Sequence, residues 1–238
     1  MGSHKSYVNV NLCTRFKYEE DDKPMPTNDP VAELPDIDEI GEDEWSELRM
    51  EREREYENEP PTDEEILNQN KYFIQQQRNF QLAAECVAAA LAGFSEVEKV
   101  VLFGSVATPL KKEIPRFKKF HRHGVAVYHE CKDIDMAVWV SNLGQLNFLR
   151  KASARALTDL LREKDIGVAS HQVDIFIMEP GTARYLGRLC NYAQCPKGKP
   201  KCHVPGCGDT PYLKQHEDFN FDDKKSFTPE NSVILFQR

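Results

Sequence analysis

Two apolar runs, each joined to a short polar motif, constrain the fold of this chain more than any other feature. The first run, Val97–Phe103, is rich in β-branched and aromatic residues and leads directly into Gly104–Ser105. This pattern is typical of a strand that ends at a tight turn. The second run, residues 133–140, begins with two carboxylates, Asp133 and Asp135, and continues as an apolar strand.

The spacing of the carboxylates carries chemical information. Side chains at positions i and i+2 of a strand lie on the same face, so we expect Asp133 and Asp135 to project side by side. A third acid, Asp174, is embedded in the apolar run 172–178, where an unpaired charge would be costly. Carboxylate oxygens are ligands that Mg²⁺ prefers. Three acids and a Gly-Ser turn together predict a metal-dependent site for phosphoryl transfer.

This ordered set of motifs resembles the nucleotidyltransferase superfamily related to DNA polymerase beta, and in size its minimal bacterial members. That family combines a Gly-Ser turn with an Asp-x-Asp motif on the next strand and a third acid on a later strand. The matching positions here are Gly104–Ser105, Asp133–Ile134–Asp135 and Asp174. They lie within residues 97–179, about a third of the chain.

The resemblance implies an enzyme that moves a nucleoside monophosphate from an NTP such as ATP to a hydroxyl group and releases pyrophosphate. Asp133, Asp135 and Asp174 would be its catalytic residues and would bind two Mg²⁺ ions, or Mn²⁺. The residues that would contact the nucleotide are Gly104, Ser105 and Lys132. The acceptor would be a protein side chain, as in toxin–antitoxin pairs, an RNA end or a small molecule. The alternatives are a non-catalytic nucleic-acid-binding module and an antitoxin-like interaction protein on the same fold.

Helical patterns flank the strands. Thr62–Glu65 has the sequence of a capping box, and apolar residues then recur at helical spacing as far as residue 91. After the second strand, Ser141 or Asn142 can cap another helix. The expected buried residues of that helix are Leu146, Leu149, Leu157, Leu160 and Leu161. This order of elements predicts an α/β fold, with a nucleotidyltransferase-like mixed sheet and flanking helices.

Charge is distributed unevenly along the chain. Residues 19–65 hold 21 acidic and 4 basic residues, whereas the rest of the chain holds 27 basic and 18 acidic residues. The basic remainder of the chain, the body, can attract nucleotides or nucleic acid, and residues 19–65, the acidic arm, can cover it. Within the arm, residues 19–40 have too little apolar surface to offset the entropy of ordering, so we expect an extended or disordered linker. Residues 42–57 fit a highly charged helix.

The segment between the two motif-bearing strands, residues 106–132, is rich in cations and aromatic residues. These residues are Lys111, Lys112, Arg116, Lys118, Lys119 and Arg122, with Phe117, Phe120, His121 and His123 between them. The segment is either a solvated surface loop or a clamp for phosphate or an acceptor, with aromatic rings available for base stacking. If the acidic arm folds over this insert, it would compete with an anionic acceptor, most strongly at low salt.

The last part of the chain has a different chemistry. Its four clustered cysteines are Cys190, Cys195, Cys202 and Cys207, separated by four, six and four residues. Four thiolates can close a tetrahedral site for a structural Zn²⁺ ion, and His203 or His216 can replace one of them. Unbound cysteines in a surface loop are the alternative.

These features together predict the domain organisation. We expect an acidic, partly disordered N-terminal extension over residues 1–60 and a nucleotidyltransferase-like catalytic domain over residues 61–189. A Cys-rich segment over residues 190–238 would pack on that domain. The sequence has no apolar run of transmembrane length, and its first residues lack a signal-peptide pattern. An odd count of seven cysteines fits a reducing compartment. We therefore predict a cytoplasmic protein with no membrane partner.

Overall fold

The structure is a computed structural model that describes residues 42–192, 208–215 and 223–238. These residues fall into two compact units. The larger unit holds Tyr72–Lys111 and the described residues from Glu130 onward, and the smaller one holds residues 42–71 and Lys112–His129. Among the described helices, none has an apolar stretch long enough to cross a bilayer.

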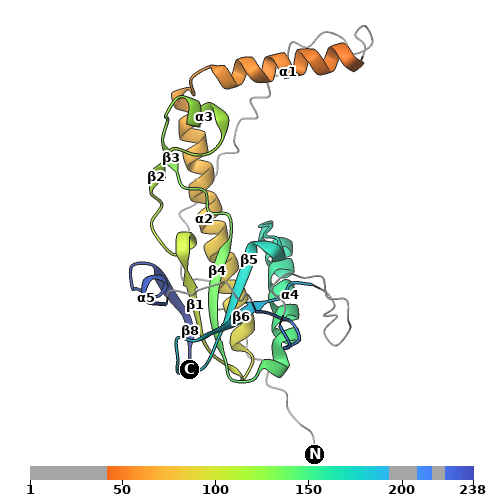
Figure 1. Cartoon of the computed structure of the whole chain (residues 1–238), viewed down its shortest axis with the longest axis vertical. Coiled ribbons are helices and arrows are strands. Elements are labelled where there is room, and N and C mark those ends of the chain that lie inside the picture. The colour runs from red at the N-terminus through yellow and green to blue at the C-terminus, as the bar shows by residue number, and fades with distance from the viewer. Residues whose placement is uncertain (1–41, 193–207, 216–222) are drawn as a thin grey trace, which may run out of the picture. The chain divides into compact units, whose positions relative to one another are not determined.

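A six-stranded sheet forms the centre of the larger unit, with the strand order β7-β6-β5-β4-β1-β8 (Figure 1). The strands are β1 Val97–Phe103, β4 Ile134–Val140, β5 Val173–Met178, β6 Tyr185–Leu189, β7 Leu213–Lys214 and β8 Ser232–Gln237. Strands β4 and β5 pair in parallel, and the other neighbouring strands of this sheet pair antiparallel. The predicted α/β class and the mixed strand direction are therefore confirmed.

Two long helices accompany the sheet. Helix α2 (Asp63–Ala92) precedes β1, and helix α4 (Leu146–Lys164) connects β4 to β5. The predicted capping box is present at the start of α2, because the Glu65 N–H donates to Thr62 Oγ1 at 3.2 Å and the Thr62 N–H donates to Glu65 Oε2 at 2.7 Å. A short 3₁₀ turn (Leu143–Gln145) comes before α4.

The two faces of the sheet are covered differently. Apolar residues of α2 and α4 join one side of the strands in a single buried cluster, which includes Val100, Leu102, Met136, Val138, Ile175 and Ile177. The strand residues between them face the other way and form a second, aromatic-rich cluster. Its members are Val101, Phe103, Ala137, Trp139, Phe176 and Met178, with Tyr185 and Phe227 packed against them.

One predicted core residue of α4 is wrong. Leu161 is 50% exposed, whereas its neighbour Leu160 is 3% exposed. Each helical residue is rotated by about 100° from the one before it. Leu161 therefore turns away from the stripe that Leu146, Leu149, Leu157 and Leu160 bury against the sheet.

The cationic insert is folded in the smaller unit. It contains β2 (Lys112–Glu113), α3 (Lys118–Arg122) and β3 (Val127–Tyr128), and β2 pairs antiparallel with β3. Lys119 is only 7% exposed, which a fully solvated loop would not produce. The same unit contains α1 (Glu42–Asn58), so the predicted charged helix is confirmed.

The C-terminal segment contributes to both edges of the large sheet. Strand β7 pairs with β6, and β8 pairs with β1, so both strands of this segment join the sheet of the larger unit. A four-residue helix, α5 (Asp223–Ser226), precedes β8. Of the four clustered cysteines, Cys190 is buried, whereas Cys195, Cys202 and Cys207 lie outside the described residues. Most of the predicted N-terminal extension, residues 1–41, also lies outside them.

Candidate active site

Strand pairing brings the predicted motifs together at one end of the neighbouring inner strands β1, β4 and β5. Asp135 on β4 is the register partner of Asp174 on the parallel neighbour β5 and of Phe103 on β1. Each acid alternates with residues that pack on the helices, so both side chains belong to the face opposite α2 and α4. Gly104 directly follows Phe103, the last residue of β1, and therefore lies at the same end of these strands.

Gly104 is needed at this position for two reasons. Its φ of +79° lies in the left-handed region, which L-residues with a side chain rarely adopt. A Cβ atom added there would also come within 2.8 Å of Asp135 Oδ2. The turn therefore approaches the carboxylate as closely as a backbone without a side chain allows.

Two glutamines of α2 hold this turn in place. The Gln77 side-chain amide donates to the carbonyls of Ser105 at 3.0 Å and Thr108 at 2.7 Å, and Gln81 donates to the Val106 carbonyl at 3.0 Å. No motif in the sequence singles out these glutamines. Their i,i+4 spacing places them on one helix face, but the spacing does not reveal which carbonyls they bind.

Asp135 is the most strongly perturbed acid of the site. Burial raises its pKa, and the charges of Asp174 and Asp133 raise it further, to about 7, although Arg188 partly opposes the change. The carboxyl of Asp135 is therefore about half ionised at neutral pH. A cation bound beside these acids would relieve their mutual repulsion and favour the ionised form.

Asp174 forms an ion pair that the sequence analysis missed. Arg188 on β6 donates from Nη1 to Asp174 Oδ2 at 2.5 Å. The side chains are partly exposed, at 30% for Arg188 and 21% for Asp174. A sequence signal existed, because Arg188 is the one charged residue in the strand Tyr185–Leu189. Burial also raises the pKa of the nearby Tyr185 to about 12, so this phenol is neutral at physiological pH.

An open pocket of about 500 Å³ adjoins the acids. Asp133 and Asp174 line it together with three basic side chains, His171, Arg188 and Lys214. Its other lining residues are Leu189, Asn191 and Tyr192. The sequence alone does not predict this pocket, because its residues come from four separate segments.

The predicted nucleotide contacts differ in their surroundings. Lys132 is exposed and directly precedes the exposed Asp133. Ser105 is half-buried, and its hydroxyl hydrogen bonds to the thiol of Cys131. Burial raises the pKa of this thiol, and the hydrogen bond from Ser105 opposes the rise. Cys131 is fully buried, which makes it a packing residue of the turn.

The acids fit Mg²⁺ by donor type, because their hard carboxylate oxygens are ligands that this ion prefers. Within the described ranges, however, no group of three or more His, Cys, Asp or Glu residues is already arranged to hold a metal ion. Asp174 already has a partner here, because its Oδ2 accepts from Arg188. The magnesium assignment stays a prediction. The zinc assignment also stays a prediction.

In the smaller unit, the end of α1 contacts the cationic insert. Lys118 Nζ lies 3.0 Å from Glu57 Oε1. Arg122 donates to the Asn58 side chain and, at 3.4 Å, to the Glu57 carbonyl. The predicted attraction between the acidic arm and the insert is therefore present at this point. Whether the arm competes with an acceptor stays a prediction.

Lys119 is committed to the structure of the smaller unit. Its Nζ lies 2.7 Å from Glu65 Oε1 and 3.6 Å from the centroid of the Tyr56 ring. Burial alone would raise the pKa of Glu65, but hydrogen bonds from Lys119, the Thr62 N–H and Tyr56 outweigh it and lower the pKa to about 2. Lys119 therefore has a structural partner, whereas Lys111 and Arg116 of the insert are exposed.

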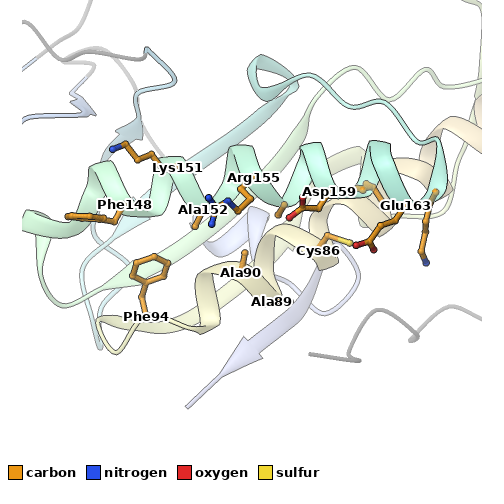
Figure 2. A pocket seen from close by; sticks show the side chains of 13 residues that line it. Cys86, Ala89, Ala90, Phe94, Phe148, Lys151, Ala152, Arg155, Asp159 and Glu163 are labelled. Atoms are coloured by element: carbon orange, nitrogen blue, oxygen red, sulfur yellow. The ribbon is translucent and has the colours of Figure 1, made fainter. Parts of the chain in front are cut away.

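A separate groove of about 720 Å³ lies between α2 and α4 (Figure 2). Small residues line its middle, including Ala89, Ala90 and Ala152, and Phe94 and Phe148 lie together at one end. Because α2 and α4 cover the face of the sheet opposite the acids, this groove is not part of the candidate active site.

No protein-family model, curated protein or solved structure matches this chain. The chemistry of the site therefore rests on the geometry of its own residues.

Proposed function

We propose that this protein is a metal-dependent nucleotidyltransferase that transfers a nucleoside monophosphate from an NTP to a hydroxyl acceptor and releases pyrophosphate. The observation that supports it best is the convergence of Gly104, Asp135 and Asp174 at one end of the inner strands β1, β4 and β5. The turn at Gly104 has no Cβ atom and can admit a phosphate group. The paired carboxylates beside it can bind divalent cations. The raised pKa of Asp135 agrees with this arrangement.

Each residue of the site would have a distinct role. Asp133, Asp135 and Asp174 would hold divalent cations, which when bound neutralise charge on the triphosphate and lower the pKa of the attacking hydroxyl. The Gly104 turn would let the phosphates approach the backbone closely, and the exposed Lys132 would contact the triphosphate. These residues would contribute by positioning and fixed electrostatics. Because cation binding favours the ionised form of Asp135, it should release a proton near pH 7.

The direct test is transfer of label. The purified full-length protein is incubated with each of the four NTPs, labelled at the α-phosphate, with Mg²⁺ or Mn²⁺ and a cell extract. We expect label to appear on protein, RNA or a small molecule, and we expect Asp135→Asn to abolish it. Asp159→Asn, the same change in a half-exposed carboxylate of α4 that pairs with Arg162, is the matched control and should retain transfer. Absence of transfer with every NTP and both ions would contradict the proposal.

One observation favours a second candidate, a non-catalytic module that binds nucleotide or nucleic acid. The Arg188–Asp174 ion pair neutralises the third acid, and a site that never binds cations would keep such a pair permanently. This module would bind NTP or RNA equally well with and without divalent cations, and it would transfer no label. Binding measured beside the transfer assay distinguishes the two candidates.

A further inference from the structure

The pocket beside the acids has an excess of positive charge on its β6–β7 side. Arg188 and Lys214 are register partners on neighbouring strands, so their side chains stand on the same face of the sheet. Two cations directly opposite each other repel, which is unfavourable without a shared anion. Arg188 has Asp174 as a partner. Within the described residues, Lys214 has no acidic partner, and its Nζ lies 5.9 Å from the centroid of the Tyr192 ring.

The surroundings of this cation pair suit an anionic ligand. His171 lines the same pocket, and so does Asn191, whose Nδ2 donates to the Ser170 carbonyl at 2.9 Å. The Tyr192 side chain is 58% exposed, which leaves a ring surface free for a planar group. A phosphate can accept hydrogen bonds from a guanidinium and an ammonium at once, and arginine can bind it with two donors. A neutral ligand would leave Lys214 uncompensated, because among these two cations only Arg188 has an acidic partner.

Asp174 lies between the two charged parts of the site. It is the register partner of Asp135 on one side and the ion-pair partner of Arg188 on the other. While Arg188 holds it, its negative charge is already neutralised. A phosphate that binds Arg188 competes with this carboxylate electrostatically, because both are anions that pair with the same guanidinium charge.

We propose that the pocket binds a phosphate-bearing group, and that this ligand draws Arg188 away from Asp174 and makes the carboxylate available to a divalent cation. The inference deepens the proposed function and rests on it for the identity of the cation site. Arg188 is then a positioning residue that couples the two ligands. The coupling is reciprocal, so the anion tightens cation binding and the cation tightens anion binding by the same factor.

The test measures Mn²⁺ binding to the full-length protein by calorimetry and by electron paramagnetic resonance. Titrations are run without a second ligand, with AMP, and with adenosine, which lacks the phosphate. Titrations without protein correct for the Mn²⁺–AMP complex. We expect AMP to tighten Mn²⁺ binding by about tenfold, within the range typical of coupled sites, and adenosine to have no effect.

Arginine and lysine variants identify the coupling residue. Arg188→Gln should bind Mn²⁺ more tightly than the wild type without AMP, because Asp174 is released, and AMP should add little. Lys214→Gln keeps the ion pair, so it should match the wild type without AMP and show reduced coupling. Arg155→Gln, on α4 at the opposite face of the sheet, is the matched control and should behave as the wild type. If Arg188→Gln does not fold, judged by circular dichroism, Lys214→Gln still decides the question.

The outcomes separate this inference from the proposed function. If Arg188→Gln retains the wild-type Mn²⁺ affinity and the full effect of AMP, or if Lys214→Gln leaves that effect unchanged, the inference is overturned even when label transfer is observed. If the coupling is present and disappears in these variants but no NTP supports transfer, the inference stands and the proposed transferase activity fails.

Discussion

Replacing Asp135 by asparagine tests the electrostatics of the candidate site most directly. Burial and the charges of Asp174 and Asp133 raise the pKa of Asp135 from 3.8 to about 7. Between these two pH values the folded protein keeps a proton on Asp135 that the unfolded chain releases. The free energy of unfolding of the wild type should therefore fall as the pH rises through this window.

The size of the effect follows from the same numbers. One pH unit corresponds to about 1.4 kcal/mol for a group that is protonated in one state only. Because Asp135 is about half ionised in the folded protein at pH 7, the wild type should lose about 2 kcal/mol between pH 5 and pH 7, and little more between pH 7 and pH 8. This figure is an upper bound, because solvent screens a carboxyl that is partly exposed. Asparagine has nearly the same shape and does not ionise, so Asp135→Asn should lack this loss.

Urea unfolding of both proteins at pH 5 and pH 8, without divalent cations, measures the difference. The free energy of unfolding of Asp135→Asn, relative to that of the wild type, should be about 1 to 3 kcal/mol higher at pH 8 than at pH 5. Titrating groups away from the site behave alike in both proteins and cancel. Asp159→Asn, in a side chain that is 45% exposed, should show no such gain. A difference between Asp135→Asn and the wild type that is equal at pH 5 and pH 8 would refute the proposed crowding of carboxylates.

Three further predictions concern other parts of the chain. Gly104→Ala should lower the free energy of unfolding by about 1 kcal/mol more than Gly181→Ala, because both glycines have positive φ but only Gly104 lies against Asp135; equal losses in urea unfolding would contradict this contact. Glu65→Gln should destabilise the protein by about 2 kcal/mol at pH 7 by weakening the bond from the buried Lys119. Since the pKa of Glu65 is lowered to about 2, its contribution is complete above about pH 4.5 and is lost as the pH falls toward 2; a variant as stable as the wild type at pH 7 would rule it out. Protein purified without added zinc should contain about one zinc ion per chain, released by denaturation with a thiol-blocking reagent, and metal-free protein with freely reactive cysteines would remove the zinc site.

Local patterns were sufficient to predict most of the helices and strands. The capping box at Thr62 and the β-branched run before Gly104 depend on neighbours within a few residues, and the structure contains both. The candidate acids could also be found in this way, because a carboxylate in an apolar strand departs from the pattern around it. Helical periodicity identified the stripe of α4, but it did not set the stripe's width, so Leu161 was placed wrongly.

Contacts between distant segments required the folded structure. Strand register decides that Asp135 stands beside Asp174 and Phe103, and register depends on how all the strands pack together. The same holds for the ion pair of Arg188 with Asp174, whose partners lie on different strands. Side-chain type alone shows that a residue can pair or bind a ligand. Its partner is set by long-range packing, because burial of apolar surface on both faces of the sheet selects the register.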